Sequence, residues 1–483
     1  MSLEAKIVKG VSWMAFFGAV SQAFSWTITI VIARILVPGD YGLMAMSTII
    51  AGYALTMSEL GLGNAIVQRH SITADELSSV FWFTTGLSVA LAASCVPVSY
   101  LTAAVMREPR VIPLTQAVSV LFLLNGLQVI PSCLLNRRMD FKTIGLVEMV
   151  SAMTASGCML VMAGAGAGVW TLLLGNVVRS AVRTILLFLK TRWRPTMHFN
   201  FSESRSFLSY GITIALGRSL FYVQEKSDRF FAGRAWTPGL LGCYTFALDL
   251  AQVPTDKIVS LINNVSFPAF CKLQNDPPAF AALYLNIAKI TAAVSLPLFT
   301  AGFILGDDLI RLVLNPKWYP MIFMFRVVCL AQILTSMNAL NNFVHAAQGR
   351  PRWSLYYNLC CVICMPASFA VAAPFGLNAM AVPWLSMYAA LCVGWIVISL
   401  RKLGVGIGRY IDAVSRPLAA TGVMSIVLFA VEGYSTAHVG TPSRILVLSA
   451  AGLAGTAAYA GYFWYFDRDY LFSLKKLTMP QGS

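Results

Sequence analysis

The chain has 483 residues, of which 58% are hydrophobic and only 11% are charged. Soluble domains carry about 25% charged residues, and a globule this apolar would expose hydrophobic surface on every side, so the composition excludes a soluble enzyme. The net charge of +15 would favour nucleic-acid binding in a soluble protein, but in so apolar a chain we expect the charge to reflect membrane topology and expect no nucleic-acid partner.

Runs of about 20 apolar residues recur along the whole chain, and each is long enough to cross a hydrocarbon core of about 30 Å. The first run is too long for a signal-peptide core of about 7–15 residues, so we expect it to be retained as a span. The sequence predicts an all-α polytopic membrane protein with fourteen transmembrane helices. Their expected ranges are 11–33, 43–63, 78–104, 112–135, 144–163, 168–189, 210–232, 240–264, 281–305, 320–345, 354–373, 377–400, 413–431 and 444–466.

Lys and Arg are distributed unevenly between the two sides that these spans create. With both termini in the cytoplasm, the cytoplasmic segments hold more than twice as many basic residues as the outer loops. The outer loops contain Arg34, Arg107, Arg110, Arg234, Arg311, Lys317 and Arg444. This positive-inside bias predicts cytoplasmic termini and agrees with an even number of spans.

The chain carries an internal repeat. The pattern R-x3-P-G-x2-G begins at Arg34 after the first expected span and again at Arg234 after the seventh, 200 residues later. Six spans separate the copies, so both have the same orientation, as in the parallel type of transporter duplication. We therefore expect two six-helix lobes, 1–200 and 201–405, followed by two additional spans and a cytoplasmic tail in 406–483.

Ionisable side chains lie inside the expected spans, although a charge at the bilayer centre costs about 2.5–3.5 kcal/mol even on a lenient insertion scale. In the seventh span, steps of three or four residues place one set on a single helical face: Arg218, Tyr222, Glu225, Lys226 and Arg229. Bases outnumber acids within the spans. The acids are Glu59, Glu148, Glu225, Asp228, Asp249 and Asp256. The set predicts a hydrated cavity with a basic excess; the alternative is internal pairing, such as Glu225 with Arg229, that serves only the structure.

A basic cavity favours an anionic ligand, because the planar guanidinium of Arg is suited to phosphate. The candidate residues for binding the anionic ligand are Arg179, Arg183, Arg218, Tyr222, Lys226, Arg229, Lys257, Lys289 and Arg326. The candidates for coupling to an ion are Glu225, Asp249 and Asp256. In-span amides such as Gln128, Asn338 and Asn341 are expected either to touch sugars or to make interhelical hydrogen bonds.

The sequence has no motif that is typical of ATP binding, metal binding or catalysis. There is no P-loop that would bind ATP, and the four His residues are scattered. We expect no catalytic residue, no metal site and no cofactor, and therefore a transporter rather than an enzyme.

Four segments resemble a known family: Lys9–Trp13, Ala33–Gly42, Glu59–Gln68 and Gly166–Trp170. They are similar to the corresponding segments of the Wzx-type flippases of the polysaccharide transport family, within the multidrug/oligosaccharidyl-lipid/polysaccharide exporter superfamily. The branch of colanic-acid and succinoglycan exporters is the most similar. The resemblance covers nearly the whole chain, but its motifs are structural turns and assign no substrate residues.

The resemblance implies a lipid flippase of the bacterial inner membrane. Such proteins move an undecaprenyl-diphosphate-linked oligosaccharide from the cytoplasmic to the periplasmic leaflet, for exopolysaccharide or lipopolysaccharide biosynthesis. It also implies two six-helix lobes around a central cavity. We expect the diphosphate and the glycan to bind at the basic candidates named above, and rocking of the lobes, driven by binding of a proton or a sodium ion, to give alternating access. The expected partners are the lipid bilayer, a polysaccharide polymerase and a co-polymerase.

Three alternatives remain open. A cation-coupled multidrug antiporter of the same superfamily would need an acidic cavity for cationic drugs, which the basic excess disfavours. A flippase for a peptidoglycan lipid precursor shares the diphosphate carrier and hence the basic cavity. A membrane polysaccharide polymerase is disfavoured by the duplication and by the lack of a sizeable outer loop with paired acids.

Overall fold

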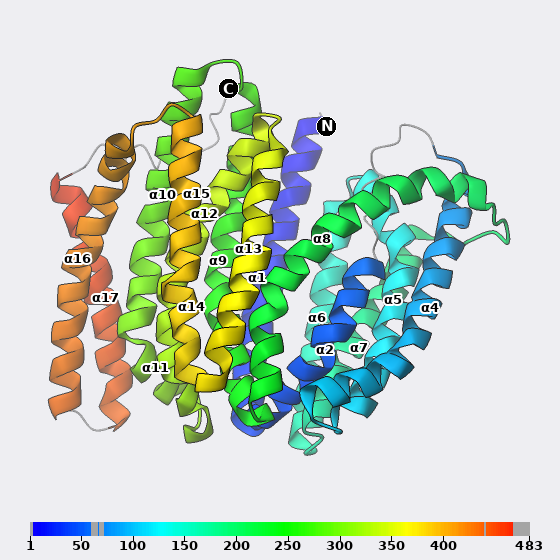
Figure 1. Cartoon of the computed structure of the whole chain (residues 1–483), viewed down its shortest axis with the longest axis horizontal. Helices are drawn as coiled ribbons and strands as arrows, with labels where there is room; N and C mark the ends of the chain where they lie inside the picture. Colours follow the sequence, from blue (N-terminus) through cyan, green and yellow to red (C-terminus); the bar gives the residue numbers. More distant parts are fainter. Residues whose placement is uncertain (1–2, 59–65, 67–71, 439–440, 467–483) are drawn as a thin grey trace. The chain divides into compact units, whose positions relative to one another are not determined.

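The computed structural model describes residues 3–58, 66, 72–438 and 441–466, and every regular element in these ranges is helical (Figure 1). The α-helices are α1 Leu3–Ile35, α2 Pro38–Ser58, α4 Ala74–Met106, α5 Val111–Arg137, α6 Phe141–Gly164, α7 Val169–Thr191, α8 Phe201–Ala235, α9 Pro238–Lys272, α10 Pro277–Ile304, α11 Gly306–Val313, α12 Ile322–Ala347, α13 Pro351–Ala372, α14 Ala381–Leu385, α15 Met387–Lys402, α16 Ile407–His438 and α17 Thr441–Phe466. Short 3-10 helices are η1 Pro316–Met321, η2 Ala373–Phe375 and η3 Leu377–Met380.

Ten helical segments in the described part of the chain are long and apolar enough to cross a membrane. They are Ser12–Ile35, Ala74–Met106, Val111–Arg137, Phe141–Gly164, Val169–Thr191, Pro277–Ile304, Pro316–Ala347, Arg352–Phe375, Leu377–Lys402 and Ile407–Glu432. The predicted all-helical membrane architecture is confirmed at this level. Each of the fourteen expected ranges overlaps a helix, but the number of spans stays a prediction, as do the lobe boundaries. Glu59, most of the Glu59–Gln68 motif and the predicted tail beyond residue 466 lie outside the described residues.

Helix ends follow local sequence signals. Thr73 and Glu76 form a capping box at the start of α4, in which the Thr73 backbone N donates to Glu76 Oε2 over 2.9 Å and the Glu76 backbone N donates to Thr73 Oγ1 over 3.1 Å. Between α6 and α7, Gly166 and Gly168 adopt φ of +76° and +56°, a region that glycine enters without steric cost. The predicted turn in the Gly166–Trp170 motif is therefore present.

The chain divides into two compact units, Met1–Thr245 and Phe246–Ser483. In unit 1, α4 packs along α5, and α6 contacts both α1 and α7. The side chains of Val80, Phe81, Ile130 and Cys133 form a buried apolar cluster between α4 and α5. This packing holds α5, α6 and α7 beside one another, and these three helices carry the candidate site described below.

Unit 2 is organised around α10, which contacts both α12 and α16, while α12 also contacts α15. The two helices that the sequence predicts as C-terminal additions, α16 and α17, pack against each other and against α10. The hydroxyl of Tyr459 on α17 donates to the carbonyl oxygen of Ala293 on α10 over 2.7 Å. The ends of α12 and α15 lie together in this unit (Figure 1), and residues at both ends line the pocket described below.

Candidate functional site

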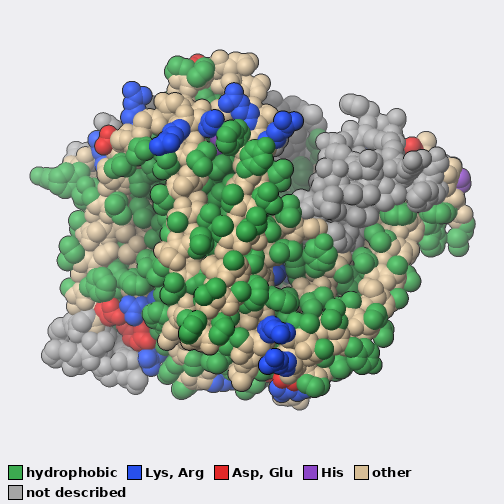
Figure 2. Space-filling model, in the orientation of Figure 1, with side chains coloured by type: hydrophobic (Ala, Val, Ile, Leu, Met, Phe, Trp, Pro, Cys, Tyr) green, Lys and Arg blue, Asp and Glu red, His purple; other side chains and the backbone are tan. Residues whose placement is uncertain are grey.

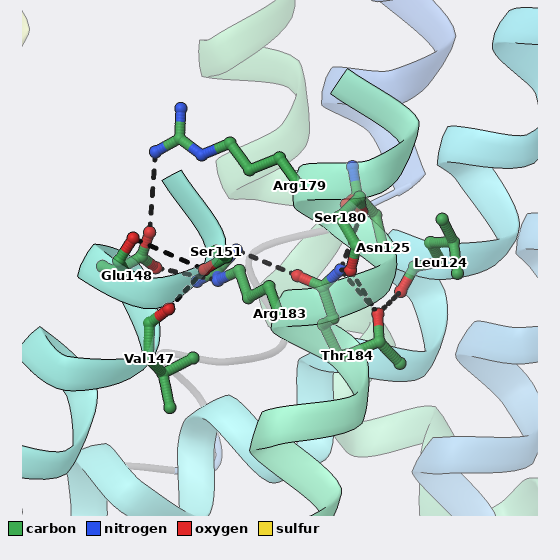
Figure 3. Close-up of polar contacts among 10 residues, drawn as sticks. Leu124, Asn125, Val147, Glu148, Ser151, Arg179, Ser180, Arg183 and Thr184 are labelled. Carbon is green, nitrogen blue, oxygen red and sulfur yellow. Dashed lines mark hydrogen bonds and ion pairs between the residues drawn. The ribbon is translucent and has the colours of Figure 1, made fainter. Parts of the chain in front are cut away.

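The best-defined group of in-span charges in unit 1 consists of Glu148 on α6 with Arg179 and Arg183 on α7, here called the α6–α7 charge cluster. Arg183 Nε lies 2.8 Å from one carboxylate oxygen of Glu148, and an Arg179 terminal nitrogen lies 3.6 Å from the other (Figure 3). The two arginines are one helical turn apart on α7, so both reach the same acid. One carboxylate faces two guanidinium groups, and the cluster keeps a formal charge of +1.

The cluster is accessible rather than enclosed. The side chains of Arg179, Arg183 and Glu148 are 53%, 35% and 38% exposed. An ion pair that is exposed to water contributes only about 0–1 kcal/mol. In a hydrated cavity, the interaction with Glu148 would therefore be weak enough for a more strongly charged anion to replace the carboxylate.

A buried polar layer between α5 and α7 orients Arg183. An Arg183 terminal nitrogen donates to Gln128 Oε1 over 3.0 Å. The amide nitrogen of Gln128 lies 2.8 Å from Ser180 Oγ and 2.9 Å from Thr184 Oγ1, and Ser180 Oγ donates to Asn125 Oδ1 over 3.2 Å (Figure 3). Gln128 is only 4% exposed. Because its amide is held by α7, the acceptor oxygen that Arg183 uses has a defined position.

Other charges that the sequence places in an expected span of unit 1 lie on α8, which is not among the ten candidate spans of the described residues. Lys226 Nζ pairs with Glu225 Oε1 over 2.5 Å, and Arg218 is exposed. The hydroxyl of Tyr222 donates to backbone carbonyls of α2, at 2.8 Å from Ile49 O and 3.2 Å from Thr48 O. These hydrogen bonds of Tyr222 hold α8 against α2.

Asp228 and Arg229 are adjacent on α8 but differ in their surroundings. The Arg229 backbone N donates to Asp228 Oδ1 over 2.6 Å, and Tyr244 on α9 donates its hydroxyl to Asp228 Oδ2 over 3.0 Å. Asp228 is 3% exposed and Tyr244 is fully buried. The buried carboxylate is thus part of the α8–α9 packing, whereas Arg229 is half-buried.

The other predicted residues belong to unit 2. Asp249, Asp256 and Lys257 are exposed on α9, and Lys289 is half-buried on α10. Arg326 Nε on α12 donates to the carbonyl oxygen of Phe303 over 2.7 Å, and its guanidinium lies 5.0 Å from the centroid of the Phe303 ring. These contacts tie α12 to the end of α10.

The structure therefore brings Arg179 and Arg183 together through Glu148, and Lys226 to Glu225. Sequence reasoning did not select Glu148 or Gln128 for the site, although Glu148 is the only acid of the expected span 144–163. The amides make interhelical hydrogen bonds, one of the two roles expected: Gln128 reaches α7, and Asn338 on α12 donates to the Tyr357 hydroxyl of α13 over 2.8 Å.

Comparison with known proteins gives one family match. A model of the family described as "Polysaccharide biosynthesis protein" matches residues 31–323. The lipopolysaccharide biosynthesis protein WzxC of Escherichia coli (strain K12) is 26% identical over 363 residues, which are 74% of this chain and 73% of WzxC. The succinoglycan biosynthesis transport protein ExoT of Rhizobium meliloti (strain 1021) is 21% identical over 475 residues, 97% of this chain and 95% of ExoT.

Solved structures show the same fold at low sequence identity. The chain is similar to the lipid II flippase MurJ in an inward closed conformation, with a TM-score of 0.73 and 12% identity over 95% of this chain and all of MurJ's. An inward-facing multidrug resistance MATE family transporter of the MOP superfamily gives a TM-score of 0.62 and 14% identity over 79% of this chain and 94% of the transporter. Both likenesses concern the fold alone.

Proposed function

Because the chain belongs to the family of polysaccharide biosynthesis proteins, we propose that it is a flippase for an undecaprenyl-diphosphate-linked oligosaccharide. It moves the repeat unit from the cytoplasmic to the periplasmic leaflet of the bacterial inner membrane, where a polymerase and co-polymerase use it for exopolysaccharide or lipopolysaccharide. Both termini lie in the cytoplasm. Transport is the whole of the proposed activity, and we assign no catalytic residue.

The observation that carries the proposal is the charge balance of the α6–α7 charge cluster, in which two guanidinium groups share one carboxylate. A diphosphate has more negative charge than Glu148 and more acceptor oxygens. Arg binds such oxygens through parallel N–H donors with fixed geometry. In the proposed loading step, the diphosphate displaces Glu148 from Arg179 and Arg183.

The other basic candidates have supporting roles in the proposal. Lys226, paired with the adjacent Glu225, exchanges that acid for phosphate in the same way. Arg218 and Arg229 on the same helix add positive charge. The proposed set is completed by Lys257, Lys289 and Arg326 in unit 2, and the glycan occupies hydrated space while the polyprenyl chain stays in lipid.

Ion coupling is proposed for Glu225, Asp249 and Asp256. A proton or sodium ion bound at these carboxylates competes with their basic neighbours, so occupancy by the ion and by the diphosphate are linked. Alternating access then follows from rocking of two helical repeats, as in other transporters with internal duplication.

The family match is the reason for preferring polysaccharide transport over the functions of a lipid II flippase or a multidrug transporter. A fold shared with both a lipid II flippase and a multidrug transporter agrees with either activity and does not discriminate. The relatives WzxC and ExoT carry names from polysaccharide biosynthesis. The basic excess on α7 and α8 also suits a phosphorylated lipid better than a cationic drug.

The test uses a strain that lacks the chain and is complemented with variants. Secreted polysaccharide is measured together with lipid-linked oligosaccharide in each leaflet of the inner membrane. We expect Arg179→Gln/Arg183→Gln to abolish polymer secretion and to leave repeat units on the cytoplasmic leaflet, with normal amounts of the variant protein in the membrane.

The matched control is Arg137→Gln/Arg138→Gln, which removes the same charge from the end of α5 in the same unit and should leave secretion intact. Normal secretion with new drug sensitivity in the deletion strain would exclude the polysaccharide function. If the deletion strain failed to secrete polymer but the Arg179→Gln/Arg183→Gln variant secreted it normally, the α6–α7 charge cluster would not be part of the binding site.

A further inference from the structure

We propose that a pocket at one end of unit 2 binds the phosphate head group of an anionic phospholipid, phosphatidylglycerol. The pocket has a volume of about 310 Å³ and lies where the loop between α9 and α10 meets the ends of α12 and α15. We call it the α10–α15 pocket. Its chemistry comes from two cations, three amides and one aromatic ring: Arg350, Lys402, Gln274, Asn275, Gln348 and Phe280. None of these residues belongs to the proposed transport site.

Backbone turns fix the positions of the two cations. At the end of α12, Gly349 adopts φ of +68° and the Arg350 backbone N donates to His345 O over 3.0 Å. At the end of α15, Gly404 adopts φ of +67° two residues after Lys402. A left-handed glycine after the last helical turn is the standard helix stop. Both side chains therefore start from defined points at the rim of the pocket.

Side-chain contacts hold the two helix ends together. His345 on α12, which is fully buried, lies with Nε2 3.0 Å from Ser399 Oγ on α15. Lys402 Nζ lies 4.3 Å from the centroid of the Trp353 ring on α13, a cation–π contact. The Lys402 ammonium group is thus in place before a ligand arrives, which lowers the ordering cost of binding.

The residues that line the pocket include two cations and no acid. Asp276 precedes α10, and its side chain accepts a hydrogen bond from the Ala279 backbone N over 3.1 Å. That carboxylate caps the helix, whose first turn contributes Phe280 to the pocket. That carboxylate offsets the partial positive charge of the helix N-terminus. The preference of the pocket for an anion therefore rests on Arg350 and Lys402.

Gln348 distinguishes among anions. Its Oε1 is buried and accepts no hydrogen bond from any described residue. A buried acceptor without a donor is unfavourable by about 1–3 kcal/mol, and an ionised phosphodiester offers no proton. The glycerol head group of phosphatidylglycerol supplies both the phosphodiester for Arg350 and Lys402 and hydroxyl donors for Gln348.

The position of the pocket suits a lipid head group. Lys and Arg side chains gather at the upper end of unit 2 in the view of Figure 2, above α12, α13 and α15. The positive-inside distribution predicts that this end lies at the cytoplasmic membrane surface. Basic pockets between helices at that surface are suited to anionic lipid head groups.

The test measures the thermal stability of the full chain in detergent as short-chain phosphatidylglycerol is titrated. The pocket variant is Arg350→Gln/Lys402→Gln, and the matched control is Arg352→Gln/Arg401→Gln, which removes two charges from neighbouring positions outside the pocket lining. We expect the lipid to stabilise the wild type and the control equally. Its apparent dissociation constant should rise by about tenfold or more in the pocket variant, because two charge-assisted contacts are lost.

Two further arms separate the sources of the phosphate. Inorganic phosphate at the same concentration should give no stabilisation. Gln348→Ala should weaken the binding of phosphatidylglycerol more than that of phosphatidylethanol, an anionic phosphodiester whose head group has no hydroxyl. If the pocket and control variants lost affinity for phosphatidylglycerol equally, the proposed site would be wrong. If inorganic phosphate stabilised the wild type as much as phosphatidylglycerol does, the assignment to a lipid would be wrong. Arg350→Gln alone, at an exposed side chain, serves if the double variant does not fold. None of these readouts depends on transport.

Discussion

Gly42 at the start of α2 lies directly against the backbone of Pro238 at the start of α9. A Cβ atom on Gly42 would overlap the Pro238 carbonyl oxygen, and a Cβ on Gly242 would overlap the carbonyl oxygen of Pro38. The two copies of the R-x3-P-G-x2-G repeat therefore pack against each other reciprocally within unit 1. A glycine is needed at the end of each motif because a side chain would collide with the opposite backbone. Backbone conformation is not the reason, since neither Gly42 nor Gly242 has a positive φ.

Replacing Gly42 by Ala should destabilise the protein by about 1–3 kcal/mol, the usual cost of overpacking. The obstacle is a backbone carbonyl, which no side-chain rotation can move aside. Gly242→Ala should have a similar effect. The melting temperature of the detergent-purified protein reports both, and Gly239→Ala is the control, because a Cβ there meets nothing within 4 Å. Equal melting of Gly42→Ala and Gly239→Ala would contradict the close packing.

Glu148→Gln tests whether the α6–α7 charge cluster serves a ligand or only the fold. If the diphosphate must displace Glu148, removing its charge frees Arg179 and Arg183, so substrate binding should be retained or tightened. Arg183→Gln should weaken binding by about tenfold, since a hydrogen bond to a charged group contributes about 1.5–3 kcal/mol. Binding of the lipid-linked substrate to purified protein measures both. If Glu148→Gln and Arg183→Gln were equally damaging, the cluster would be a structural ion pair.

Gln128→Ala should destabilise unit 1 by about 1–3 kcal/mol, because it removes the hydrogen bonds that the buried amide makes with Ser180, Thr184 and Arg183 on α7. Thermal unfolding of the purified chain is the measurement. Asn176→Ala is a suitable control, since among the described residues that exposed amide bonds only to the backbone of its own helix, at Leu172 O. A change below about 0.5 kcal/mol for Gln128→Ala, the range of ordinary surface substitutions, would show that the polar layer does not contribute.

Glu108 in the loop between α4 and α5 should make stability depend on acid pH. Its side-chain hydrogen bond with Arg110, in which Arg110 Nε lies 2.8 Å from Glu108 Oε1, lowers the pKa of the Glu108 carboxyl below its ordinary value. A lowered folded-state pKa adds stability above the unfolded-state pKa, and this is lost as the pH falls through the folded-state pKa.

The melting temperature of wild type and Glu108→Gln should therefore differ at neutral pH and converge in acid. Arg110→Gln should remove most of the same difference, because Arg110 is its cause. Parallel melting curves for wild type and Glu108→Gln across the acid range would refute the linkage.

Hydropathy and local signals predicted the helices well. Each expected span overlaps an observed helix, and the turn at Gly166 and Gly168 follows from residues within it. The break of the expected span 377–400 at Ser386, between α14 and α15, was not foreseen. Apolar composition is continuous across that position, so hydropathy contains no sign of the interruption.

The candidate site was predictable only in part. The four-residue spacing of Arg179 and Arg183 is enough to place them on one face of α7, but it does not say that α6 supplies Glu148 to both. Similarly, the periodicity of the seventh expected span places Tyr222 on the same helical face as Arg218 and Lys226. It does not predict that the Tyr222 hydroxyl bonds to the backbone of α2. Partners of this kind depend on contacts between residues far apart in the chain.

The sequence by itself determined the membrane-helical class, the family and the basic excess, because hydropathy, composition and charge are properties of short segments. Tertiary packing alone decided which acid meets which base, how Gln128 orients Arg183, and that two motifs 200 residues apart interlock at Gly42 and Gly242. Helical periodicity specifies the face on which a side chain lies. The neighbour that this face meets is set by the packing of whole helices.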